Sequence, residues 1–197
     1  MRTATVAVMA AAFGAAFARP APARDFHCPA AGTIVTTSTG TSMAWQEAES
    51  GHPHICRAAY GPGRPGYWAF ALVPSDNLVT AMQDEANLAH YMPLTPDKAF
   101  TFDVTRLYEG AMRRFVGSVV VLPAERELAG VRRPVSVVHI SAVGGAPLSD
   151  DGRVTTASVR LIVDRSTNAL LGIDIDPTGP LSGLPTVHWS ALSITAP

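Results

Sequence analysis

The chain carries little charge and almost no lysine. Of its 197 residues 16% are charged, Lys98 is the single lysine, and the formal net charge is −1. The arginine pairs Arg113-Arg114 and Arg132-Arg133 stand apart from each other and from any run of aromatic residues. Because nucleic-acid-binding proteins cluster their basic residues, this composition argues against nucleic acid as a partner.

Motifs of the common enzyme classes are also missing from the sequence. It contains no G-x-S-x-G, S-x-x-K, H-E-x-x-H or C-x-x-C motif and no P-loop. Asp176-Pro177-Thr178-Gly179 departs from the Asp-Thr-Gly turn of aspartic proteases by its proline. His188 and Ser190 share one face of a predicted strand, but no acidic residue is identifiable that would orient the imidazole. We therefore predict no catalytic residue.

Long apolar runs are absent after the first eighteen residues, where one alanine-rich run occurs. Arg2 precedes the uncharged run Thr3–Ala18. A basic start, an apolar middle and small residues at the end are typical of a secretory signal peptide. Two A-x-A sites predict cleavage after Ala18 or Ala23, so residues 1–23 are interpreted as the signal peptide. We expect export to the periplasm of a bacterium or beyond, without stable membrane insertion after cleavage.

Cysteine is nearly absent as well. Cys28 and Cys56 are the only two, and in an oxidising compartment the cysteines of an exported protein are expected to pair. Such a disulfide stabilises the fold by about 3–4 kcal/mol in the chain-entropy model. Residues 24–197 show no repeat, linker or change of composition and are predicted to form a single β-rich domain.

The best-defined secondary structure in the sequence is a β-hairpin between residues 157 and 176. Apolar and polar residues alternate along both arms, and Asp164–Asn168 supplies the turn. The alternation predicts an inner face with Leu161, Val163, Leu171 and Ile173, and a water-facing side with Arg160, Asp164, Asp174 and Asp176.

Eight further segments have the composition of strands. They are Gly32–Thr37, Ser42–Glu47, Ile55–Tyr60, Tyr67–Val73, Ala99–Tyr108, Phe115–Leu122, Pro134–Val143 and Val187–Thr195.

One helix is predicted, over residues 76–90, with Ser75 or Asp76 as its N-cap. Leu78 and Met82 lie on its expected apolar face, and the acidic pair Asp84-Glu85 on a solvated one. The fold class is mainly β: an antiparallel curled sheet or barrel of about ten strands with one covering α-helix.

Histidines cluster near the cysteines in sequence. His52, His54 and Cys56 have the spacing that places side chains on one face of a strand, and a disulfide would bring His27 near them. Three imidazoles could hold zinc or copper. The alternative, which we favour because no fourth ligand is evident, is that they are exposed polar residues beside a turn. No cofactor is expected.

A family resemblance rests on a small set of residues. Met92-Pro93-Leu94 and Lys98, then Glu125 and Gly130, precede long strands and a hairpin. In this order the chain resembles uncharacterised bacterial periplasmic β-rich domains of half-barrel, carrier-like form. The pattern differs at Asp97, where those domains have glycine, and in the residues after Gly130. The resemblance implies a half-barrel or barrel and no catalytic residue.

Three functional hypotheses follow from these features. The first is an exported, non-enzymatic domain that binds an apolar small molecule or an envelope protein, because a curled sheet leaves a concave apolar interior. The second is a metal-dependent or hydrolytic enzyme with a dispersed site that uses histidines such as His188, and the third is a purely structural or interaction domain. The predicted residues of an apolar ligand pocket are Trp68, Phe70, Leu161, Val163, Leu171, Ile173 and Trp189.

Overall fold

The computed structural model describes residues 26–63, 65–75, 77–108, 111–145, 154–178 and 187–197. The predicted signal peptide lies outside these residues. The elements of the described chain, in order, are β1 (Ile34–Thr37), β2 (Ser42–Gln46), β3 (Ile55–Tyr60), β4 (Gly66–Ala69), β5 (Val73–Ser75), α1 (Leu78–Leu88), the 3-10 helix η1 (Ala89–Tyr91), β6 (Ala99–Tyr108), β7 (Ala111–Leu128), β8 (Val131–Gly145), β9 (Val154–Asp164), β10 (Leu170–Thr178) and β11 (Val187–Thr195).

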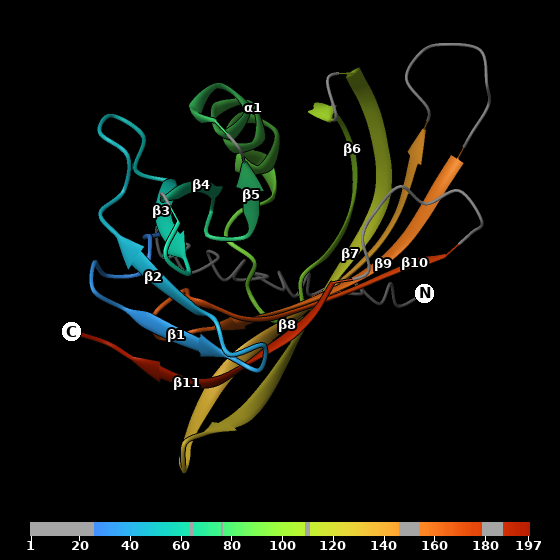
Figure 1. Cartoon of the computed structure of the whole chain (residues 1–197). Helices are drawn as coiled ribbons and strands as arrows, with labels where there is room; N and C mark the ends of the chain where they lie inside the picture. The colour runs from blue at the N-terminus through green and yellow to red at the C-terminus, as the bar shows by residue number, and fades with distance from the viewer. Residues whose placement is uncertain (1–25, 64, 76, 109–110, 146–153, 179–186) are drawn as a thin grey trace, which may run out of the picture.

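All eleven strands belong to one antiparallel sheet (Figure 1). Their order is β5-β4-β3-β2-β1-β11-β10-β9-β8-β7-β6, so β5 and β6 are its two edges and the sheet is not closed. This confirms the predicted mainly β fold and selects the curled sheet over the barrel. The strand β11 pairs with β1 on one side and with β10 on the other, and thereby joins the first five strands to the last five.

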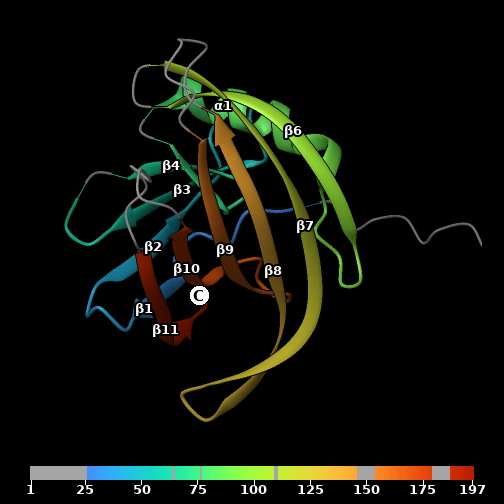
Figure 2. The same ribbon diagram turned by 90° about the vertical axis from the view of Figure 1, so that its right-hand side faces the viewer.

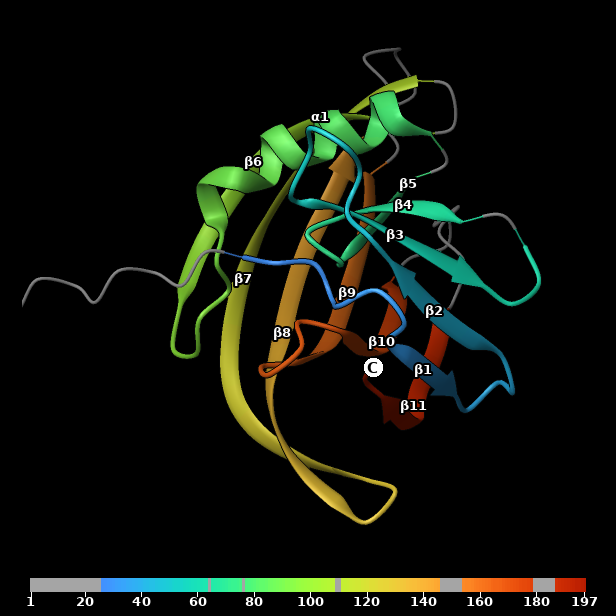
Figure 3. The same cartoon turned by 90° about the vertical axis from the view of Figure 1, so that its left-hand side faces the viewer.

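The helix α1 lies across the opening between the two edges (Figure 3). It contacts β3, β4 and β5 on one side and β6 on the other. Asn87 donates a hydrogen bond from Nδ2 to the carbonyl oxygen of Thr105 in β6, at 3.0 Å. On the other side, Glu85 lies 3.3 Å from Nδ1 of both His52 and His54. The helix therefore lies between the two edge strands, β5 and β6, each of which has a sheet neighbour on one side only.

The predicted helix is confirmed, but its predicted packing face is wrong. Asn77 is the N-cap and accepts a hydrogen bond from the backbone N–H of Thr80, at 2.9 Å. Ala81 and Asp84 are buried, whereas Met82 is 42% exposed. The small side chain of Ala81 permits close approach to the sheet, and Asp84 is satisfied by a hydrogen bond from the Ser75 hydroxyl, at 2.9 Å.

The aromatic segment predicted as one strand, Tyr67–Val73, forms two strands in the structure. Phe70 and Ala71 both have left-handed backbones, with φ of 52° and 55°, and reverse the chain between β4 and β5. The N–H of Phe70 donates to the carbonyl of His54, at 2.7 Å. Both side chains are buried. Tertiary packing therefore holds a turn that neither residue favours by itself.

The two longest strands extend past their predicted ends. We expected β7 to stop at Leu122 and β8 to begin at Pro134, because Pro123 and Pro134 lack an N–H donor. Both prolines lie where a neighbouring strand has ended: β6 reaches only as far as Val120 along β7, and β9 reaches only as far as Val135 along β8. Proline is tolerated at such edge positions, so the β7–β8 ladder continues to the turn at residues 129–130.

The free end of this hairpin, residues 122–137, bends across the outer face of the sheet, and we call it the hairpin overhang. In the first part of β7, Val119 and Val121 are buried on the inner face, which is the face toward α1. In the overhang the opposite face is buried, and Leu128 is only 4% exposed. Figure 2 shows β7 and β8 as a long arc that runs from α1 to below β11. The overhang thus creates a second, smaller packed region.

Asp164 lies in this region, and the prediction that it faces water is wrong. Its side chain is fully buried, and Asp164 is the register partner of Val135 in the overhang. Burial by itself raises the pKa of Asp164, but hydrogen bonds from the Ser166 hydroxyl, from Arg133 at 2.9 Å and from the N–H groups of Ser166 and Thr167 outweigh burial and lower it. The turn at Asp164–Asn168 is therefore built around an ionised carboxylate.

The disulfide Cys28–Cys56 is confirmed, with the two Cα atoms 5.4 Å apart. Cys56 belongs to β3 and is completely buried. The bond holds the segment before β1 against a core that both halves of the sheet share. The largest side chains of that core are Trp45, Phe70, Met43, Ile55, Leu170 and Leu171. A disulfide is compatible with an exported protein. Within the described residues no helix is long and apolar enough to cross a bilayer.

Candidate functional site

A row of polar side chains crosses four neighbouring strands on the outer face of the sheet. The register pairs His139 of β8 with Arg160 of β9, Arg160 with Asp174 of β10, and Asp174 with His188 of β11. Directly paired residues of antiparallel strands have their side chains on the same face, with Cβ atoms about 5 Å apart. Sheet geometry therefore places these four side chains side by side.

Asp174 is the centre of this row. Its Oδ2 atom lies 3.2 Å from the guanidinium of Arg160, and its Oδ1 atom is hydrogen-bonded to Nδ1 of His188. The side chains of Arg160 and His188 are about half exposed, and that of Asp174 is 38% exposed. Solvent screens ion pairs of this kind, so their net contribution to stability is small. Their effect is on the charge of the site, because the single carboxylate of Asp174 contacts two side chains that can be positively charged.

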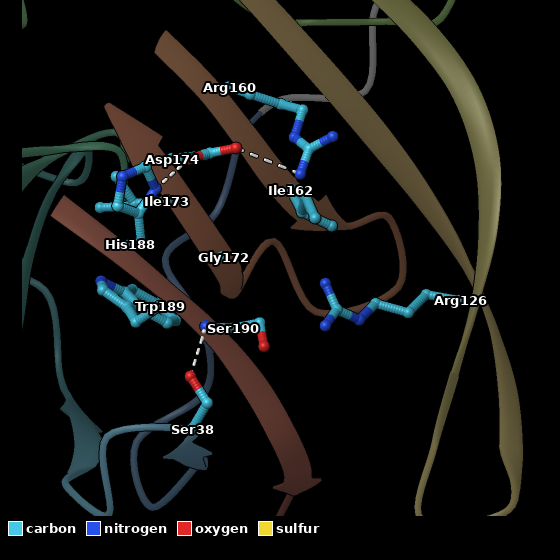
Figure 4. A pocket seen from close by; sticks show the side chains of 10 residues that line it. All are labelled: Ser38, Arg126, Arg160, Ile162, Gly172, Ile173, Asp174, His188, Trp189 and Ser190. Atoms are coloured by element: carbon cyan, nitrogen blue, oxygen red, sulfur yellow. Dashed lines mark hydrogen bonds and ion pairs between the residues drawn. The ribbon is translucent and has the colours of Figure 1, made fainter. Parts of the chain in front are cut away.

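A pocket of about 410 Å³ adjoins this row, between the sheet and the hairpin overhang (Figure 4). This volume is within the range of sites for small molecules. Ten residues line it: Ser38, Arg126, Arg160, Ile162, Gly172, Ile173, Asp174, His188, Trp189 and Ser190. Most come from β9, β10 and β11, and Arg126 comes from β7 on the opposite side, as Figure 4 shows.

Arg126 is the most unusual group in the pocket. Its guanidinium donates one long hydrogen bond, of 3.5 Å, to the carbonyl of Ala191. Among the described residues, no carboxylate lies within 4 Å of it, whereas the neighbouring Arg160 is paired with Asp174. Burial, and secondarily the charge of Arg160, lower the pKa of Arg126. Within the described part of the chain, this partly buried positive charge therefore has no carboxylate partner.

Gly172 forms the floor beneath Arg126. A Cβ atom at this position would lie 3.7 Å from a terminal nitrogen of Arg126 and 3.3 Å from both Cδ1 of Ile162 and the carbonyl oxygen of Trp189. A larger side chain would therefore fill the space below the guanidinium. The absence of a side chain at Gly172 keeps this part of the pocket open.

The pocket does not assemble a nucleophile in the described residues. Asp174 is the acidic partner of His188 that the sequence did not identify, but no hydrogen bond joins His188 to Ser190. The N–H of Ser190 donates to the hydroxyl of Ser38, at 3.1 Å, and Figure 4 shows the Ser190 side chain turned toward Arg126. Nucleophilic catalysis needs the serine hydroxyl within hydrogen-bond reach of the base, so the arrangement suits binding better than acyl transfer.

The histidines predicted as metal ligands do not gather into one site. His52 and His54 flank the two oxygens of Glu85, and the ring of His54 stacks on Phe70 with centroids 4.9 Å apart. His27 is exposed. In the part of the chain that the structure describes, no group of three His, Cys, Asp or Glu side chains could hold a metal ion.

The residues predicted to line an apolar ligand pocket mostly belong to the core. Phe70, Leu161, Leu171 and Ile173 are buried in the core cluster. The remaining three, Trp68, Val163 and Trp189, pack against that cluster. Two of the seven, Ile173 and Trp189, also line the pocket described above. The inner face at these positions is occupied by the protein's own side chains.

Sequence reasoning missed Arg126 altogether. It lies in the segment Glu125–Leu128, which has no local motif, and enters the pocket only because the overhang folds back. Comparison of the chain with protein families, with curated proteins and with solved structures finds no match. The functional conclusion is therefore drawn from the geometry of the pocket.

Proposed function

We propose that the chain is an exported, non-enzymatic binding domain that holds a small anionic molecule in the pocket beneath the hairpin overhang. The signal-peptide pattern of residues 1–23 and the disulfide support export. The pocket supports binding of a small molecule, and its charge supports an anion. The expected apolar ligand of the inner face is set aside in this proposal because core side chains fill that face.

The observation that carries the proposal is the uncompensated charge of Arg126. A guanidinium offers five N–H donors in a planar fork that matches a carboxylate or phosphate group. Among the described residues, the polar contact of the Arg126 guanidinium is one 3.5 Å hydrogen bond. Burial makes an unpaired charge costly, so binding of an anion beside Arg126 would be favourable.

The residues that line the pocket indicate which class of anion it would bind. Ile162 and the bare backbone at Gly172 offer an apolar surface beside Arg126. Hydroxyl groups are available from Ser38 and Ser190 on the other side. Arg160 is already neutralised by Asp174, which leaves one net positive charge from these three ionised groups. A small monoanion with an apolar body, such as an aromatic carboxylate, fits this combination.

The test is a binding measurement with two probes, benzoate and sulfate, on the full mature chain. Titration followed by NMR should move the backbone signals of Gly172 and Ser190. Arg126→Gln should weaken binding by about 10- to 100-fold, since hydrogen bonds to charged groups contribute about 1.5–3 kcal/mol. Arg132→Gln is the matched control, because Arg132 is an exposed arginine of the same overhang, 3.5 Å from Glu125.

Benzoate binding that exceeds sulfate binding supports the aromatic carboxylate, and the reverse order supports an inorganic or phosphate-like anion. Equal losses in Arg126→Gln and Arg132→Gln would show that the probes respond only to net charge. That result, or the absence of any shift near Gly172, would contradict the proposal.

A further inference from the structure

We propose that His188 makes anion binding in this pocket dependent on pH, so that the anion is held more tightly in acid than at neutral pH. This inference rests on the proposed function, since it concerns the same pocket. Its basis is the position of Asp174, a single carboxylate that contacts both Arg160 and His188.

While His188 is uncharged, Asp174 neutralises Arg160 alone. The ionised groups of the pocket then sum to one positive charge, which is that of Arg126. When His188 gains a proton, the imidazolium becomes a second cation for Asp174. The pocket then carries two net positive charges, and the guanidinium of Arg160 is less restrained by its ion pair.

The other charged groups that face His188 do not reverse this sign. Asp176 of β10 lies on the same face and is exposed, and its carboxylate adds no positive charge to the pocket. His139 of β8 lies next to Arg160 in the register, and its protonation also adds positive charge. On the other side, β1 contributes no titratable residue, and the residue after it is Ser38.

The expected size of the effect is modest because the row is half exposed. One additional charge at several ångströms, partly screened by solvent and salt, changes anion affinity by about threefold to tenfold. Reciprocal linkage requires that the bound anion favours protonation by the same factor. Binding near neutral pH must therefore be accompanied by proton uptake.

The experiment measures the dissociation constants of benzoate and sulfate at about pH 5.5 and about pH 7.5, because both probes stay ionised over this interval. Wild type should bind about threefold to tenfold more tightly at the lower pH. His188→Gln should abolish most of this difference. His90→Gln, at an exposed histidine in η1, should leave the difference unchanged. Calorimetry in two buffers of different ionisation enthalpy should show proton uptake in wild type and not in His188→Gln.

Failure of this inference can be distinguished from failure of the proposed function. If neither probe binds at either pH, the proposed function is wrong and the inference fails with it. If the probes bind with Arg126-dependent affinity that is equal at both pH values, only the inference is overturned. If His139→Gln removes the pH dependence and His188→Gln does not, the assignment to His188 is overturned, and proton uptake would follow His139.

Discussion

Asp164 is buried and Arg126 is partly buried, yet of the two only Asp164 has a charged partner among the described residues. Asp164 receives hydrogen bonds from Arg133 and from the turn that follows it. Arg126, by contrast, has one long hydrogen bond to a backbone carbonyl. Burial of a charge is costly unless it is paired. The charge of Asp164 is therefore explained by its partners in the chain, and that of Arg126 is the basis of the proposed anion site.

The substitution Asp164→Asn should lower the free energy of unfolding by about 3 kcal/mol, because it leaves Arg133 without its carboxylate in a covered site. The pKa of Asp164 is lowered in the folded state, so its contribution is present above the unfolded value of about 3.9 and is lost as the pH falls below it. Denaturant unfolding at several pH values checks both statements. The difference from wild type should shrink below about pH 4.

A difference that stays constant into acid would show that Asp164 acts through its shape rather than its charge. Asp103→Asn provides a control, since Asp103 is exposed and paired with Arg114 at the surface. That variant should unfold nearly as wild type does.

Alternation of polar and apolar residues predicted correctly that Arg160, Asp174 and Asp176 share the outer face. It also predicted that Asp164 faces water, which is wrong. Asp164 was predicted wrongly, and Arg126 was not predicted as a pocket residue, for the same reason. A sequence period of two assigns a residue to a face of the sheet, but it does not show what covers that face. Residues 122–137 are far from Asp164 in sequence, and no local pattern predicts their contact.

At the scale of secondary structure, the stability of the β7–β8 hairpin depends on the conformation of its turn. Its two loop residues, Ala129 and Gly130, both have positive φ, of 49° and 79°, between the paired residues Leu128 and Val131. Two-residue turns of this kind favour Asn-Gly, because alanine is strained in the left-handed region and asparagine tolerates it.

Ala129→Asn should therefore stabilise the protein by about 0.5 kcal/mol, and Ala129→Val at the same position should destabilise it, because a β-branched side chain is disfavoured there. Thermal unfolding of the two variants measures both effects. Since Ala129 is exposed, contacts with the core do not obscure the comparison. Opposite signs for Asn and Val are required; a loss of stability in both would mean that the turn has another conformation in solution.

The strands that alternate regularly, such as β9 and β10, were predictable because one face is buried or half-buried along the residues whose burial is described. The exceptions have physical causes in the tertiary structure. The split between β4 and β5 requires two left-handed residues that their own propensities oppose, and the length of β7 and β8 depends on prolines that fall beyond the ends of β6 and β9. Neither cause is visible before the neighbouring strands are placed.

At the scale of the whole molecule, the disulfide and the pocket lie in different parts of the sheet. The disulfide closes a loop of 28 residues within the first five strands, whereas the pocket is formed mostly by β7 and β9–β11. The fold class and the disulfide could be predicted from composition and periodicity. The pocket could not, since its residues come from segments up to 152 positions apart, as Ser38 and Ser190 show.

Replacement of both cysteines by serine should lower the free energy of unfolding by about 3–4 kcal/mol in the chain-entropy model. The fraction that remains folded should bind benzoate as wild type does. Urea unfolding and probe titration at low temperature measure the two properties separately. A variant that is still folded but has lost probe binding would show that the first five strands shape the pocket, against the separation described here.

The central position of β11 has a consequence for how the molecule is assembled. Residues 187–195 pair with β1 and with β10, so the sheet remains two unconnected pieces until this late segment of the chain is present. Contacts between such distant segments form slowly because the entropy of loop closure opposes them. A chain that emerges from a translocation pore with its N-terminus first would therefore have no complete sheet to obstruct its passage. The order of the strands would thus delay completion of the sheet until residues 187–195 have been transported, which suits the export proposed for this protein.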